Sequence, residues 1–335
     1  MHSTLILRSR LIAFVIGCAF AWAGLTDGLA AQTPVSAAGT TDAIQAAESL
    51  IRSGQRQGAV ELLSTHLAAE RNDGRAWLLL GRIYLDDVRT WHRQGHTGPT
   101  SAPALLTFAA LAFEKAEQFL TDSSDVYRVL ATVERATSQI ESEGWPANGR
   151  WDWAAEDLPL PPVLGELGHN LIASCPRNGV LVTGSEVETA AAWGEHLAGD
   201  TRSDVILLRP DMYAWDARYR GRMAAAIGAD STQDLPTALA HVAASRPICL
   251  GPTVDSIAAP PPEWQAIRLV RAAGAMLPFT DSMTVFQLGR SAPSIWTTAA
   301  LEVYDRAAQR NRGLCSTLFA PTETPGQPLV AACRR

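Results

Sequence analysis

The feature that most limits how the second half of this 335-residue chain can fold is an alternation of short apolar runs with helix-length segments. Strands are predicted at 179–183, 204–208 and 247–250, with helices at 164–174, 189–198, 217–227, 235–244 and 294–309. Strands that alternate with helices of this length are typical of right-handed βαβ units and a parallel sheet. We therefore predict a small, Rossmann-like α/β domain over residues 164–310, followed by a Pro/Thr-rich tail at 311–335.

The sequence of the first half of the chain predicts helices only. Residues 40–143 are rich in Ala, Leu, Glu, Gln and Arg, with apolar residues at helical spacing. The clearest segment is Trp77-Leu-Leu-Leu80-Gly81-Arg-Ile-Tyr84, which fits the W-x₂-L-G-x₂-Y first helix of a tetratricopeptide repeat. We expect Trp77, Leu80 and Tyr84 to share one helix face, and Gly81 to let the next helix approach closely.

Segments after this helix continue the same repeat pattern. Phe113, with alanines four residues before and three after it, matches the second helix of a repeat, and Tyr127 with Leu130 opens another. About residues 40–140 thus resemble a tetratricopeptide-repeat protein of two and a half to three repeats. The resemblance implies a concave surface that binds peptides or protein partners. The alternative is a helical array that only supports the neighbouring domain.

Two stretches interrupt the predicted elements. An insertion relative to the repeat period falls between Tyr84 and Ala109, where glycines and prolines predict a loop. His92 and His96 lie there at i, i+4 spacing, which on a helix would suit a metal, but Gly95 favours a solvated loop, and we predict no metal site. Residues 144–163 read as a Pro-rich linker whose tryptophans pack against another element.

The predicted strand ends gather acidic and hydroxyl side chains. In parallel sheets ligands bind outside the carboxyl ends of the strands, and here those ends carry Ser185, Glu186, Glu188 and Asp211. The carboxylates could hold a cation or bind a sugar. Neither the dinucleotide fingerprint nor a phosphate-binding loop is present, and we predict no cofactor.

A second resemblance covers about residues 164–280. Asn178–Thr189, Arg202–Ile206 and Arg246–Ile248 resemble the soluble domain that follows the membrane part of certain bacterial mannosyltransferase-like proteins of uncharacterised function. Those relatives carry Asp-Asn-Asp after the strand-end glycine. In this chain only Glu186 and Glu188 preserve the acidic character, so the ligand set that the resemblance implies is retained in part.

The N-terminus predicts export. Arg8 and Arg10, the apolar stretch 11–25 and the small residues 28–31 form a secretory signal over residues 1–31. The apolar stretch is shorter than the roughly 20 residues of a membrane span, and no later segment is longer. We expect a periplasmic protein; lipid anchoring through Cys18, in a lipobox-like context, is the alternative.

Charge and cysteine usage agree with this location. A net charge of −6 argues against nucleic acid as a partner. Beyond the signal, an even number of cysteines in an oxidising compartment predicts two disulfides among Cys175, Cys249, Cys315 and Cys333. Four cysteines allow three pairings, of which Cys315 with Cys333 is preferred because it would pin the tail.

These observations favour a binding function over a catalytic one. A complete nucleophile–base arrangement is not visible: Gly184-Ser185 lacks the G-x-S-x-G pattern, and the histidines of this half fall on predicted helices. Our hypothesis is an exported scaffold or assembly subunit that binds a protein partner, or a membrane complex, of the cell envelope through the helical repeats. The alternative is a protein that binds or processes a glycan or lipid-linked sugar at the acidic strand end.

Overall fold

The computed structural model describes residues 38–96, 101–151, 158–199, 202–254, 264–275, 282–318 and 328–334. Met1–Thr41 and Asp42–Arg335 are separate units, and the architecture below is that of the second. The predicted export signal, with Cys18, lies outside the described residues. Within the described ranges, no helix combines the length and apolar character that a membrane span requires.

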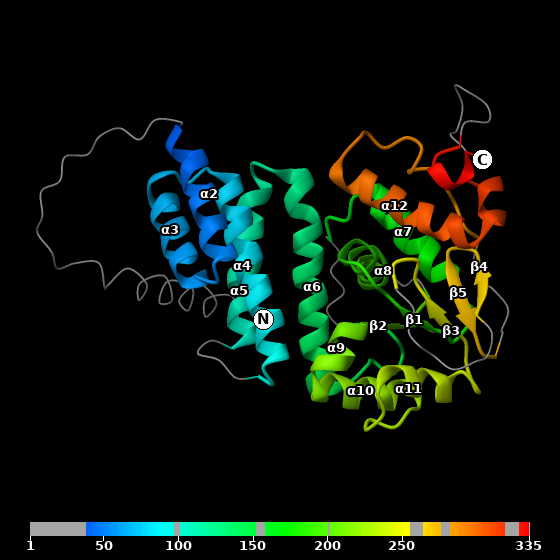
Figure 1. The fold of residues 1–335 in the computed structure, drawn as a ribbon. Helices are drawn as coiled ribbons and strands as arrows, with labels where there is room; N and C mark the ends of the chain where they lie inside the picture. Colours follow the sequence, from blue (N-terminus) through cyan, green and yellow to red (C-terminus); the bar gives the residue numbers. More distant parts are fainter. Residues whose placement is uncertain are drawn as a thin grey trace, which may run out of the picture. The chain divides into compact units, whose positions relative to one another are not determined.

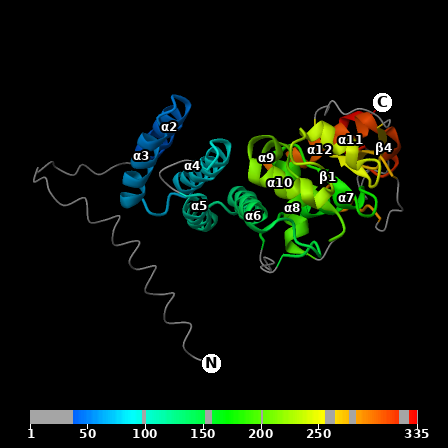
Figure 2. The same cartoon turned by 90° about the horizontal axis from the view of Figure 1, so that it is seen from below.

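Consecutive helices form the first part of the fold (Figures 1 and 2). They are α2 (Ala38–Arg52), α3 (Arg56–Ala69), α4 (Gly74–Arg93), α5 (Ala102–Glu117) and α6 (Thr121–Glu143). Apolar residues of α2, α3 and α4, among them Leu80, make a small core of their own. The last two helices pack on α4 and contribute to the main core of the molecule, which includes Phe113 and Leu130.

Gly81 decides how closely α5 approaches α4. A Cβ atom here would lie 2.5 Å from Cε1 of Phe113, so only glycine leaves room for that ring. The Phe113 ring is fully buried and stacks on Tyr127 of α6, with ring centroids 5.6 Å apart. Trp77 is half-buried, and its indole N–H donates to the carbonyl of Arg71 over 2.8 Å.

Helix α4 is longer than the sequence suggested. Asp73 caps its start by accepting from the backbone N–H of Arg75 at 3.0 Å, and the helix continues to Arg93. The predicted solvated loop at His92 is therefore wrong, because His92 is fully buried in the last helical turn. Helical geometry ends only at Gly95, whose φ of 65° is the left-handed conformation that commonly follows a helix.

A mixed sheet lies at the centre of the second part. Its strands are β1 (Val180–Val182), β2 (Ile206–Leu208), β3 (Ile248–Leu250), β4 (Gln265–Ile267) and β5 (Val270–Ala273), in the order β2-β1-β3-β5-β4. The first three strands are parallel, as predicted. The prediction of a parallel sheet throughout is wrong, since β5 runs antiparallel to both β3 and β4. Only Arg268 and Leu269 separate β4 from β5, a link that permits a hairpin but no parallel crossover.

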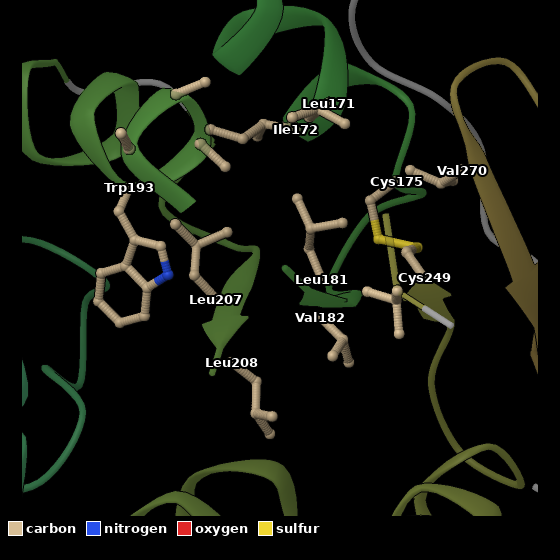
Figure 3. Packing of buried hydrophobic residues seen from close by; sticks show 14 of the residues in the cluster. Leu171, Ile172, Cys175, Leu181, Val182, Trp193, Leu207, Leu208, Cys249 and Val270 are labelled. Atoms are coloured by element: carbon tan, nitrogen blue, oxygen red, sulfur yellow. A yellow bond between two sulfur atoms is a disulfide. The ribbon is translucent and has the colours of Figure 1, made fainter. Parts of the chain in front are cut away.

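Helices cover both faces of this sheet, as Figure 1 shows. On one face, in contact with one another, lie α7 (Pro162–Ala173), α8 (Glu186–Ala198) and α12 (Ile295–Arg310). On the other face lie α9 (Pro210–Trp215), α10 (Ala217–Ile227) and α11 (Leu235–Val242). Figure 3 shows the core, with Leu171 of α7 above Leu181 of β1 and Leu207 of β2. Each of these leucines is fully buried.

Two disulfides close the fold. Cys175 follows α7 and is bonded to Cys249 of β3, across the core shown in Figure 3. The expected bond between Cys315 and Cys333 is present and joins the short 3-10 helices η1 (Arg312–Ser316) and η2 (Ala331–Cys333), which both contact α12. The described parts of the tail are therefore held against α12.

The helical array and the α/β part share one hydrophobic core. Helix α6 contacts both α8 and α10. Gly194 of α8 permits this approach, because a Cβ there would lie 2.9 Å from Val129 of α6. In the predicted linker, Trp145 packs edge-on against Trp151 and Trp193, at centroid distances of 5.7 and 5.8 Å. Packing of these aromatic rings holds residues 145–151 against α8.

Candidate functional site

The carboxyl ends of β1 and β2 form the natural binding crevice of this sheet. The chain leaves β1 through Gly184 to α8 on one face and leaves β2 through Arg209 to α9 on the other. Adjacent strands whose connections diverge in this way leave a crevice between the loops, and ligands of α/β sheets bind there. In this protein α4 and α6 of the helical array stand against that crevice and become its outer wall.

A cleft of about 240 Å³ occupies this position. We call it the switch-point cleft; its charged and aromatic lining consists of Asp86, Arg89, Arg93, Glu134, Glu186, Arg209, Asp211 and Trp215. The volume lies just below the roughly 300–1,000 Å³ of sites for drug-sized ligands, so the cleft has room for one small ligand. Its walls carry charges of both signs.

Glu134 holds the wall of the cleft together. This carboxylate of α6 is 1% exposed; it accepts from Arg209 at 2.7 Å through Oε2 and from Arg89 at 3.1 Å through Oε1. Arg209 also donates to Asp211 at 2.9 Å, and Arg89 donates to Glu186. A chain of ion pairs thus runs from α8 through α4 and α6 to the end of β2.

The pairing keeps these groups charged although they are buried. Burial alone would raise the pKa of Glu134, but the guanidinium groups of Arg209 and Arg89 hold it below its usual value. Burial would likewise lower the pKa of Arg209, yet Glu134 and Asp211 raise it. The pKa of Asp211 is lowered, because Arg209 outweighs the effect of burial. Glu134, Arg209 and Asp211 therefore stay charged at neutral pH.

The structure separates the four predicted ligand-binding residues into two groups. Glu186 and Asp211 line the switch-point cleft, each in an ion pair with an arginine. Ser185 instead caps α8, where its hydroxyl accepts from the backbone N–H of Glu188 at 3.3 Å. Glu188 is fully buried and does not line the cleft.

Glu188 ties together the loops that follow β1 and β3. Its carboxylate accepts from the backbone N–H of Gly184 at 3.2 Å and of Thr253 at 2.9 Å, and from the Thr253 hydroxyl. Burial raises the pKa of Glu188, and these hydrogen bonds offset the effect only in part. The residue supports the base of the site and does not face the cleft.

Trp215 adds an aromatic surface to the cleft. It is the last residue of α9 and is 45% exposed, which is unusual for a large aromatic side chain. Arg93 of α4 lies over its ring at 5.2 Å from the centroid. The next residue, Asp216, caps α10, where Oδ1 accepts from the backbone N–H groups of Arg218 and Tyr219 at 2.8 and 2.9 Å.

A second polar cluster lies beside the cleft and was not expected. It consists of His92 and His96 from the end of α4, Glu141 of α6 and Asp216, and we call it the His–carboxylate cluster. One ligand atom from each side chain lies within 4.8 Å of every other. His96 reaches it through a backbone φ of 68°, a conformation that histidine tolerates better than most residues. The indole of Trp91 stacks on the His96 ring at 4.3 Å.

The sequence held one signal for this cluster. The i, i+4 spacing of His92 and His96 pointed to it, and an α4 that extends to Arg93 places His92 on a helix after all. Glu141 and Asp216 carried no local mark, because they approach the histidines only through the packing of α6 and α9 against α4 and of α10 against α6.

No protein-family model, curated protein or solved structure matches this chain.

Proposed function

We propose that this chain is an exported binding protein whose ligand, a neutral sugar residue of a glycan, enters the switch-point cleft. The main observation behind this proposal is the composition of the cleft at the ends of β1 and β2. It combines paired charges of both signs with the exposed Trp215 ring. Two disulfides support export, because such bonds persist in oxidising compartments.

The chemistry of the lining supports a polyhydroxyl ligand. Each sugar hydroxyl both donates and accepts hydrogen bonds, which suits a wall where carboxylates and guanidinium groups alternate. A strongly charged ligand would have to compete for Arg209 or Arg89 with carboxylates already bound to them. The apolar face of a sugar ring can stack on Trp215, as aromatic side chains provide large contact area at little conformational cost.

A binding experiment with three variants tests this proposal. The full exported chain is screened on a glycan array, and hits are measured by calorimetry in wild type, Trp215→Ala and Glu186→Gln. Both side chains are about half exposed, so their replacement leaves the core intact. Glu302→Gln, an exposed carboxylate on α12, is the matched control.

We expect a hit whose affinity falls at least about tenfold in the two cleft variants, roughly the loss of one good contact, and is unchanged in the control. A flat array, or a hit that all variants bind equally well, would refute the assignment to this cleft.

A second candidate function is the binding of a cell-envelope protein by the helical array. Its support is an exposed apolar strip on and just after α5: Phe108, Leu111 and Phe119 are 38%, 47% and 44% exposed. Large exposed apolar residues close together are typical of interaction surfaces. The side of α4 and α6 that faces α8–α10 is covered by the chain itself, so a partner would use the α5 side.

Capture from solubilised envelope tests this candidate. Wild type is compared with Phe108→Ser/Leu111→Ser and with the exposed polar change Glu114→Gln on the same helix. The candidate gains support if one stoichiometric partner is lost only in the double variant and then binds the purified chain directly. If wild type and both variants capture the same proteins, the α5 strip is not the binding surface.

A further inference from the structure

We propose that the His–carboxylate cluster is a zinc-binding site in which His92, His96, Glu141 and Asp216 each supply one ligand. The site is separate from the switch-point cleft, and the inference does not depend on the proposed sugar ligand. Imidazole nitrogens and carboxylate oxygens are common zinc ligands, and four protein ligands make a closed, structural site.

The separations of the ligand atoms suit one small cation. Zinc ligands at roughly 2.0–2.1 Å from the metal in a tetrahedron stand about 3.3 Å from each other. Nδ1 of His92 lies 2.7 Å from Oε1 of Glu141 and 3.4 Å from Oδ2 of Asp216. Nε2 of His96 lies 3.8 Å from Oε2 of Glu141 and is also in contact with Oδ2 of Asp216.

The state of His92 is the second, independent observation. Its side chain is 0% exposed, and neither ring nitrogen makes a hydrogen bond with any described residue. Nδ1 is close to two carboxylates, but without the geometry of a hydrogen bond. A buried polar group without a hydrogen bond destabilises the fold, so such groups are rare in native proteins. A metal ion between Nδ1 and the carboxylates would satisfy that nitrogen.

Charge balance points the same way. Asp216 and Glu141 bring two negative charges into a region where their side chains are 1% and 8% exposed. Buried charges are ordinarily paired or bound to a metal. Two neutral imidazoles would leave both carboxylates uncompensated, whereas one divalent cation neutralises them.

The position of the cluster gives the metal a structural role. Its ligands come from α4, from α6 and from the cap of α10, and Figure 1 shows the end of α6 beside α10. His96 and Asp216 are 120 residues apart in the sequence. A metal held by all four residues would fasten the helical array to the α/β part next to the switch-point cleft.

Asp216 and His92 allow variants that remove a ligand while sparing the fold. In Asp216→Asn the atom that caps α10 is kept, because Oδ1 accepts the backbone bonds and only Oδ2 faces the histidines. His92→Gln is the second variant. His66→Gln is the matched control: His66 is also nearly buried beside a carboxylate, Asp73 at 2.8 Å, but belongs to no such cluster.

The full exported chain and these three variants are stripped with chelator, titrated with Zn²⁺ by calorimetry, and titrated with Co²⁺ by visible absorption. Circular dichroism confirms that each variant is folded. We expect one Zn²⁺ per chain in wild type and in His66→Gln, with the intense visible bands of tetrahedral Co²⁺. In Asp216→Asn and His92→Gln the affinity should fall at least about 100-fold, as much as loss of an outer-shell partner can cost. Absence of stoichiometric Zn²⁺ in wild type, or unchanged affinity in Asp216→Asn, would overturn the proposal.

Discussion

Replacement of Glu134 by glutamine is expected to destabilise the fold far more than replacement of a carboxylate in an equally close surface pair. Glu134→Gln keeps the size of the side chain but leaves Arg209, only 5% exposed, without its 2.7 Å partner. Loss of one partner of a buried ion pair typically costs about 3–5 kcal/mol. Arg209 keeps Asp211 and Arg89 keeps Glu186, so we expect the lower end, about 3 kcal/mol.

The matched control is Asp87→Asn. Asp87 pairs with Arg56 at the same 2.7 Å, but their side chains are 31% and 33% exposed. Solvent screens such a pair, and its loss should cost less than about 1 kcal/mol. Urea unfolding followed by tryptophan fluorescence measures both free energies of unfolding. If Glu134→Gln costs no more than Asp87→Asn, burial does not set the strength of this network and the reasoning fails.

The pH dependence of the same variant provides a second check. Arg209 and Arg89 hold the pKa of Glu134 below its usual value in the folded protein, whereas in the unfolded chain a glutamate titrates near about 4.3. A depressed folded pKa gives stability that is present above the unfolded pKa and is lost as the pH falls through the folded pKa. The difference in unfolding free energy between wild type and Glu134→Gln should therefore narrow on acidification below about pH 4.3. A difference that stays constant would contradict the charge-based explanation.

Two further predictions concern the backbone and the disulfides. Gly81→Ala should destabilise the fold by about 1–3 kcal/mol, because the new Cβ meets Phe113. Gly221→Ala on α10, where no atom lies within 4 Å of the new Cβ, should stabilise it by roughly 0.5–1 kcal/mol. Thermal unfolding measures both variants, and a change of stability with the same sign in both would contradict the packing argument. Replacing Cys175 and Cys249 by alanine opens a loop of 74 residues and should cost about 4 kcal/mol by chain entropy. Urea unfolding checks this, and no loss of stability would show that the bond contributes nothing.

Local pattern was enough to locate most elements. The helix predicted at 217–227 is α10, and each predicted strand contains β1, β2 or β3. These predictions succeed because apolar periodicity and turn residues act over a few neighbouring positions. The sequence also placed Glu186 and Asp211 at strand ends, where the switch-point cleft lies.

Local sequence patterns did not predict the contacts between segments that are distant in the sequence. Whether β5 runs parallel or antiparallel depends on its link to β4. The role of Ser185 depends on the helix that it caps, and the role of Glu188 depends on Thr253, which lies 65 residues after it in the sequence. Likewise, the spacing of His92 and His96 is written in the sequence, but only tertiary packing supplies Glu141 and Asp216. The sequence by itself located most of the helices and the three parallel strands, because the forces that select these elements are local. Tertiary structure alone decides which charges are buried together, because desolvation and pairing depend on what the rest of the chain places around them.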